Sequence, residues 1–328
     1  MDSEQTLEEE AKYREQALAV LDQLGLRESN NVRVRPTSGH HSSILVPCDG
    51  TDGRPFLLKY FIPPAEGKFY PAGVRLEDYP RRESAFYRYL DSVDNGRQRV
   101  PAPKTILLDN QDPPQWILLE RLPMAVGPLE EVLGMDHVFE LLRTLRNIPI
   151  DGLSGRRDFP LNRWDTFSYL ERVRLMYDPV LFVIGPERWS RILEFYNEAL
   201  RWTESRPDTV VHGDFTSANI LVHEEGKPYL VDFERVGTGN EDHDFAWFWI
   251  HTKRSQDWKR ALVTRYWDGR VGSERVRSEW GIRAAIVYLA LRRLRFSYLS
   301  VGDEDPERAH NLGLLDAALI GSQELFPV

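Results

Sequence analysis

Cysteine is almost absent from this sequence: Cys48 is the only one among 328 residues. A single thiol can form no intrachain disulfide and cannot supply a zinc site built from several cysteines. Long apolar runs are also absent, because the longest apolar stretch, 284–299, is interrupted by Arg292, Arg293 and Arg295. We therefore expect a protein of the reducing cytoplasm that does not enter the membrane.

Positive charge is in deficit as well. The 42 Lys and Arg residues stand against 51 Asp and Glu residues, which gives a net charge of −9 and a pI near 5.5. Binding to nucleic acid draws on an excess of basic side chains, so we expect no nucleic-acid partner. The first residues, Met1 to Glu4, are polar and acidic, whereas a signal peptide begins with a basic end and an apolar run.

Composition and length are those of an ordinary globular protein with room for two structural lobes. The 41% hydrophobic and 28% charged residues exclude collagenous, low-complexity and wholly disordered chains. Apolar spacing predicts a leading helix over 3–25 and another over about 80–91. Short β-like runs separated by turn signals are predicted at 32–35, 43–46, 55–61, 104–108 and 115–120.

Beyond residue 123 the apolar spacing becomes mainly helical. We predict an α+β protein with a small antiparallel β-sheet lobe over 1–122 and a larger, mainly helical lobe over 123–328. One β-rich patch, 210–233, interrupts the helices of the second lobe.

That patch carries the most informative motif of the chain. It reads His212-Gly213-Asp214, four further residues, Asn219, the apolar run 220–222, a turn at Gly226, the apolar run 229–231 and Asp232. The two apolar runs should pair as a hairpin, which brings Asn219 close to Asp232 with Asp214 in the adjoining loop.

An amide oxygen beside a carboxylate suits Mg²⁺, which takes its remaining ligands from water and phosphates. A further carboxylate nearby can accept a proton from an attacking hydroxyl, and together these groups are the minimum apparatus of phosphoryl transfer. Each of these residues alone is more often a turn or cap residue. The occurrence of all of them together in this order is far less probable by chance.

The whole pattern resembles the Brenner-type motif of the aminoglycoside phosphotransferase family, which includes choline, homoserine and related small-molecule kinases. The resemblance implies a bilobal protein-kinase-like fold, with Asp214 as the catalytic base and Asn219 and Asp232 as Mg²⁺ ligands. It also implies that His212 is a structural part of the loop. We expect Asp244, at the start of a later Asp-Phe-Ala, to brace the catalytic loop.

The remaining parts of a kinase should lie in the first lobe. Lys59, on the apolar run 55–61, is the candidate for binding the α- and β-phosphates, with Glu83 on the next helix as its partner. Lys and Glu at such places are usually solvent-facing, so these two assignments depend on the downstream motif.

A loop and a connecting segment complete the predicted nucleotide site. Backbone N–H groups and hydroxyls of the loop 37–43 would bind phosphate oxygens, and main-chain groups at the connection between the lobes would bind adenine. The residues concerned are Ser38, Gly39, Ser42 and Ser43 in the loop, and Glu120 and Leu122 at the connection. The expected cofactors are ATP, or another nucleoside triphosphate, and Mg²⁺.

The acceptor is expected to be a small-molecule hydroxyl. Only eleven residues separate Asp232 from Asp244 and no Ala-Pro-Glu follows, which leaves no room for the activation segment of a protein kinase. Carboxylates near Asp214 would suit an aminoglycoside, and aromatic rings a quaternary ammonium, although solvated loops and core packing are commoner roles. The candidates are Glu234, Glu241, Asp242, Trp247, Trp249 and 303–305. Sugars, homoserine and methylthioribose remain open, as does the oligomeric state.

Two other functions compete with the kinase. The first is a non-catalytic nucleotide-binding module of the same fold, which the single glycine in the phosphate loop keeps open. The second is metal-dependent hydrolysis through His212, Asp214 and Asp232, which is disfavoured because no second histidine stands at metal-ligand spacing.

Overall fold

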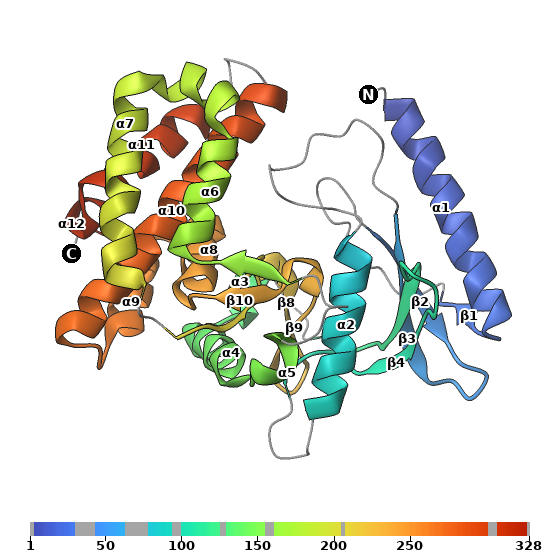
Figure 1. Cartoon of the computed structure of the whole chain (residues 1–328). Helices are drawn as coiled ribbons and strands as arrows, with labels where there is room; N and C mark the ends of the chain where they lie inside the picture. Colours follow the sequence, from blue (N-terminus) through green and yellow to red (C-terminus); the bar gives the residue numbers. More distant parts are fainter. Residues whose placement is uncertain are drawn as a thin grey trace.

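The computed structural model describes residues 3–29, 43–62, 78–93, 100–124, 129–154, 161–204, 207–300 and 307–326. The described chain forms a small lobe built on one β-sheet and a larger lobe built mainly of helices (Figure 1). The predicted strand at 32–35 and the acidic run at 303–305 lie outside the described residues.

The sheet of the small lobe is antiparallel, with strand order β1-β2-β3-β5-β4. Its strands are β1 (Arg27–Glu28), β2 (Ser43–Asp49), β3 (Pro55–Phe61), β4 (Thr105–Leu108) and β5 (Trp116–Glu120). Helix α1 (Ser3–Gln23) contacts β2 and β3, and α2 (Asp78–Val93) contacts β4. The leading helix and the helix at about 80–91 therefore form where the apolar spacing predicted them.

Side-chain alternation along β3 determines which residues face which layer. Phe56, Leu58 and Tyr60 pack in the cluster that contains Ala17 and Leu21 of α1. Phe61, on the opposite face, packs in the main core with residues of α2. Lys59 lies between Leu58 and Tyr60, so the same alternation turns it away from α1.

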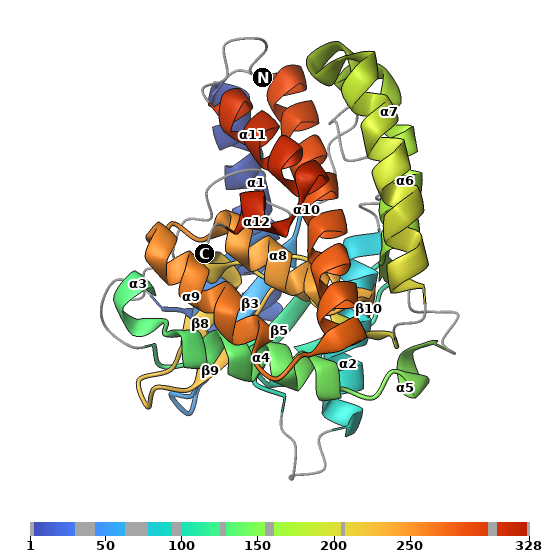
Figure 2. The same cartoon turned by 90° about the vertical axis from the view of Figure 1, so that its left-hand side faces the viewer.

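The larger lobe surrounds the long helix α10, which contacts α6, α7, α8 and α11 (Figure 2). Residues 284–291 of α10 are buried. Its helices are α3 (Leu129–Val132), α4 (Met135–Asn147), α5 (Asp151–Ser154), α6 (Thr166–Leu175), α7 (Tyr177–Thr203), α8 (Asp242–His251), α9 (Gln256–Trp267), α10 (Gly272–Ser300), α11 (Glu307–Ile320) and α12 (Ser322–Leu325). None of the helices in the described ranges combines the length and apolarity needed to cross a bilayer.

Two small β structures are embedded in this lobe. The predicted hairpin is present: β8 (Ile220–Val222) pairs with β9 (Pro228–Leu230), which begins one residue earlier than expected. A further three-stranded sheet was not predicted: β10 (Gly237–Gly239) pairs with both β6 (Asn162–Trp164) and β7 (Thr209–Val211). Strands of three residues that pair across such long separations carry no local periodicity that the sequence could show.

Candidate active site

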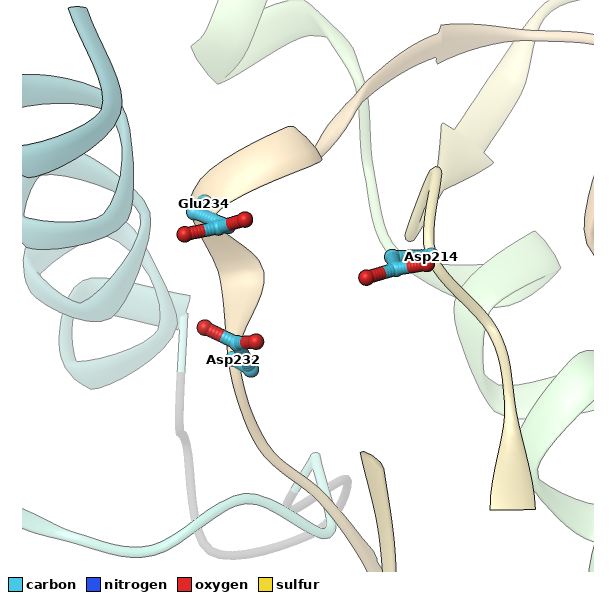
Figure 3. Close-up of side chains that lie close together, drawn as sticks. All are labelled: Asp214, Asp232 and Glu234. Carbon is cyan, nitrogen blue, oxygen red and sulfur yellow. The ribbon is translucent and has the colours of Figure 1, made fainter. Parts of the chain in front are cut away.

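Three carboxylates converge where the loop after β7 faces the segment after β9. Each of Asp214, Asp232 and Glu234 contributes one oxygen to a set whose members all lie within 4.8 Å of one another. Figure 3 shows Asp214 on one loop and, across from it, Asp232 and Glu234 together on the other. Such a set of oxygen donors fits a hard divalent cation.

Asp244, in the first turn of α8, accepts two hydrogen bonds from the loop that carries Asp214. The backbone N–H groups of His212 and Gly213 donate to the two carboxylate oxygens of Asp244 at 2.7 and 3.0 Å. Burial raises the pKa of Asp244 to about 7, and the two N–H donors oppose this shift. Asp244 therefore braces the loop, as its position in the sequence predicted.

Gly213 allows this loop to pass close to its neighbours. Its φ is +78°, and a Cβ at this position would lie 2.4 Å from the Arg235 carbonyl oxygen and 2.8 Å from Trp164 Nε1. Trp164 Nε1 also donates to that carbonyl at 3.0 Å. A side chain at residue 213 would therefore strain the backbone and disrupt this contact.

We expect Gly213→Ala to lower the free energy of unfolding by about 2 to 5 kcal/mol, through strained φ and overpacking together. Urea denaturation measures this loss. The matched control is Gly226→Ala, at a φ of +79° with nothing within 4 Å of the added Cβ, which should cost only about 1 kcal/mol of backbone strain. Equal losses in the two variants would contradict the crowding at Gly213.

His212 links the loop to the end of the hairpin. Its Nε2 lies 3.0 Å from the Val231 carbonyl oxygen, and its Nδ1 accepts the N–H of Asp214 at 3.3 Å. Burial lowers the pKa of His212, so the ring is neutral near pH 7 with its proton on Nε2. Both ring nitrogens are engaged by backbone, which leaves neither one for the metal-dependent hydrolysis considered above.

Asn219, the predicted amide ligand, lies in the short 3₁₀ turn Ser217–Asn219. Its Nδ2 donates to the carbonyl oxygen of Asp214 at 2.9 Å, so the amide oxygen is the atom left to bind a cation. Glu234 was predicted as a candidate for the acceptor site and not as a metal ligand, although it lies only two residues beyond Asp232.

Lys59 of the small lobe reaches this carboxylate group. Its Nζ donates to Glu83 Oε2 at 2.6 Å and to Asp232 Oδ1 at 2.5 Å. Burial alone would lower the pKa of Lys59, but the two carboxylates outweigh burial and raise it, so the ammonium stays charged. The structure thus joins the predicted lysine, its predicted partner and the predicted metal ligand in one chain of contacts.

Helix α2 fixes the segment that carries Asp232 and Glu234. Phe233, between them, is fully buried with its ring centre 4.8 Å from that of Phe86 and 5.4 Å from that of Tyr87. Arg82 of the same helix donates to the Glu234 carbonyl oxygen at 2.7 Å. Asp232 itself adopts a left-handed φ of 68°, which an Asp tolerates better than most residues.

The other predicted nucleotide residues belong to β2, to β5 and the segment that follows it, or to residues outside the described ranges. Ser38, Gly39 and Ser42 fall outside the described residues, and Ser43 is the first residue of β2, paired with Phe61. At the connection between the lobes, the N–H of Glu120 donates to the Lys104 carbonyl oxygen at 2.9 Å. Leu122 follows the end of β5 at Glu120. Their assignment to the nucleotide remains a prediction.

The acidic candidates for an acceptor site are used within the larger lobe. Glu241 Oε1 accepts from Arg270 at 2.8 Å. Asp242 has no exposed surface, and its Oδ1 accepts from the hydroxyls of Tyr266 and Ser278 at 2.8 and 2.9 Å. Trp249 packs edge-on against Phe326. Of the other candidates, Glu234 lies in the carboxylate group with Asp214, and the ring centre of Trp247 lies 5.8 Å from the guanidinium carbon of Arg235.

Comparison with known proteins identifies a family and solved structures that match this chain. The model of the phosphotransferase enzyme family, APH, matches residues 50–300, which is more than half of the chain. No curated protein matches the chain. Solved structures match along nearly the whole chain at low sequence identity.

Three of those structures illustrate the likeness. A thermostable mutant of aminoglycoside phosphotransferase APH(4)-Ia, in ternary complex with ADP and hygromycin B, has a TM-score of 0.56 and 14% identity, covering 93% of this chain and 97% of its own. The gentamicin complex of APH(2″)-IIa has a TM-score of 0.56 and 16% identity over 99% and 98%. A choline/ethanolamine kinase family protein from Mesorhizobium loti has a TM-score of 0.52 and 17% identity over 90% and 91%. The predicted bilobal protein-kinase-like fold is confirmed.

Proposed function

Because the chain belongs to the phosphotransferase enzyme family, we propose that it transfers the γ-phosphoryl group of ATP, or of another nucleoside triphosphate, to a hydroxyl of a small molecule. The expected family and the expected small-molecule kinase are both confirmed at this level. The observation that supports the specific reaction is the convergence of Asp214, Asp232 and Glu234 with Lys59 of the other lobe.

Asp214 is the proposed base. Its carboxylate is partly exposed and lies 4.0 Å from Arg235, whereas its backbone is held by His212 and Asn219, so the side-chain oxygens can accept a proton from a hydroxyl. A bond forms between the acceptor oxygen and the γ-phosphorus, the bond from that phosphorus to the β-bridging oxygen breaks, and ADP leaves. The hydroxyl proton passes to Asp214.

The remaining carboxylates and Lys59 serve the nucleotide in this proposal. Asp232, the amide oxygen of Asn219 and Glu234 would together hold Mg²⁺. That ion, when bound, neutralises charge on the phosphates. Lys59, oriented by Glu83, would bind the α- and β-phosphates.

The small lobe, 1–122, would bind the nucleotide, and 123–328 would supply the base, the metal ligands and the acceptor site. Ser38, Gly39, Ser42 and Ser43 remain the proposed phosphate loop, and Glu120 and Leu122 the proposed adenine contacts. Solved relatives contain ADP or AMP-PNP, which supports a nucleotide as the cofactor. Hygromycin B and gentamicin in those complexes support a small-molecule acceptor.

Mg-ATP is expected to raise the melting temperature of the protein. At about one hundred times its Kd a ligand adds about 2.7 kcal/mol of stability. Lys59→Met should remove most of this shift, because the phosphates lose the ammonium group that binds them. The carboxylates of Glu83 and Asp232 also lose the positive charge between them. Thermal unfolding with and without Mg-ATP measures both effects.

The matched control for that experiment is Lys104→Met, an exposed lysine of the same lobe, which should keep the full shift. A parent protein that ignores Mg-ATP would contradict the proposed function. A full shift without ADP formation from any hydroxyl acceptor would instead favour the non-catalytic nucleotide-binding module.

A further inference from the structure

Two arginines approach one tryptophan beside the proposed base. Arg235, in the 3₁₀ turn Phe233–Arg235, has a guanidinium nitrogen 4.0 Å from Asp214 Oδ1. Its guanidinium carbon lies 5.8 Å from the ring centre of Trp247, and that of Arg292 lies 5.0 Å from the same ring. We call Arg235, Trp247 and Arg292 the donor cluster.

Two buried hydrogen-bond donors of this cluster lack acceptors within the described part of the chain. Arg235 Nε and Trp247 Nε1 are buried and have no hydrogen-bond partner there. Arg292, half-buried on α10, lies over the face of Trp247 and is attracted by the charge of Asp214, but it forms no hydrogen bond or ion pair with a described residue. Unsatisfied donors at several neighbouring positions are uncommon and need an explanation.

The two arginines differ electrostatically: Asp214 and other acidic groups outweigh burial and raise the pKa of Arg235, whereas Arg292 is in an unfavourable position. Burial, and after it the positive charge of Arg235, lower the pKa of Arg292 to about 10. A partly desolvated cation beside another cation costs stability unless an anion joins them. In the described part of the chain the carboxylates within 4.0 Å of Arg235 are those of Asp214 and Glu234, the latter with Oε1 3.7 Å from Arg235 Nε, and both belong to the carboxylate group already described.

A polycationic acceptor would meet the wrong charge here. Of the acidic candidates in the described ranges, Glu234 belongs to the proposed metal group, and Glu241 and Asp242 are occupied by Arg270, Tyr266 and Ser278 within the fold. Apart from the carboxylate group, the charge beside Asp214 in the described chain is that of guanidinium groups, whose planar donor forks match carboxylate and phosphate oxygens.

We propose that the phosphoryl acceptor is itself an anion, a small molecule that carries a carboxylate or a phosphate ester near the hydroxyl that is phosphorylated. Arg292 binds the anionic group, and Trp247 holds the guanidinium in place. The assignment rests on the proposed phosphotransferase function, and Asp214 takes the hydroxyl proton as above. Arg235 lies closer to Asp214 than any other described arginine and can also face the transferred phosphoryl group, so Arg292 is the residue that tests the assignment.

Two matched sets of compounds test acceptor charge directly. The six-carbon set is gluconate, glucose 6-phosphate, glucose and glucosamine, and the three-carbon set is glycerate, glycerol 3-phosphate, glycerol and 3-amino-1,2-propanediol. Each is added at about 10 mM to protein saturated with Mg-ADP, and the further rise in melting temperature is measured. Mg-ATP with the same compounds gives ADP formation. Carboxylate and phosphate members separate the two sources of the anion.

We expect an anionic member of at least one set to raise the melting temperature and to be phosphorylated, and the neutral and cationic members of that set to do neither. Arg292→Gln should weaken binding of that anion at least about tenfold, the scale of a charge-assisted hydrogen bond, with the KM for ATP unchanged within about twofold. Arg292→Lys, which keeps the charge, should lie between. Arg277→Gln, on the same helix and about 22 Å away along its axis, should match the parent.

The unliganded Arg292→Gln protein should melt no lower than the parent, because the variant removes an unpaired charge that Arg235 repels. Failure of the parent to respond to Mg-ADP contradicts the proposed function itself. With that response intact, the anionic acceptor is overturned by a preference for neutral or cationic members, by the absence of any response to the anions, or by unchanged anion binding in Arg292→Gln.

Discussion

Asp214→Asn is expected to lower kcat by about 10²-fold or more, the usual contribution of a positioned general base, while folding and Mg-ATP binding stay nearly intact. The structural bonds of this residue come from its backbone: its N–H donates to His212 Nδ1, and its carbonyl accepts from Asn219 Nδ2. Asparagine preserves both bonds and the size of the side chain. ADP formation with a phosphorylated acceptor measures the loss.

Asp208→Asn is the matched control for this variant. Asp208 precedes β7, and it pairs with Arg163 at the surface, so its loss should leave turnover unchanged and stability nearly so. If Asp214→Asn had the same turnover as the parent, another group would have to remove the proton.

Asp232→Asn is expected to lower turnover by about 10²- to 10³-fold at a fixed low Mg²⁺ concentration, since metal ions contribute several kcal/mol to such reactions. Asparagine tolerates the left-handed φ of 68° at this position, and Lys59 keeps Glu83 as a partner. The variant therefore removes a charged ligand oxygen with little change in the backbone. Turnover as a function of Mg²⁺ concentration measures the effect, and the half-maximal concentration should rise.

The variant Glu83→Gln distinguishes the contribution of Lys59 from that of the metal ligands. It leaves Asp214, Asp232 and Glu234 in place but removes the negative charge of one partner of Lys59, so we expect a higher KM for ATP with an unchanged Mg²⁺ dependence. If Asp232→Asn kept the Mg²⁺ dependence of the parent, Asp232 would not be a metal ligand.

Much of the fold could be predicted because its signals are local. The helices at 3–25 and 80–91 follow from apolar spacing, and the hairpin around Gly226 follows from two short apolar runs and a turn. The family and its fold are confirmed by the match over 50–300. By contrast, β6, β10 and β7 pair across distant segments of three residues each, two of them parallel, and no local pattern marks such contacts.

The position of Lys59 was predictable for a different reason. Alternation along β3 leaves one face for α1 and the other for α2, so a lysine within an apolar strand must face a partner in the second layer. The contacts to Glu83 and Asp232 agree with that expectation. Its role in binding phosphate stays a prediction, as do those of Asp214, Asn219 and the phosphate loop.

By itself, the sequence determined the family, the two-lobe fold and the segment from His212 to Asp232, because neighbours along a hairpin remain neighbours in space. Only the tertiary structure decided the environment of the proposed acceptor site. It placed Glu234 with the metal group, buried Asp242 in a hydrogen-bond network, and brought Arg292 of α10 to Trp247 of α8. Packing between distant helices sets the charge beside Asp214, and the composition of a single segment cannot encode it.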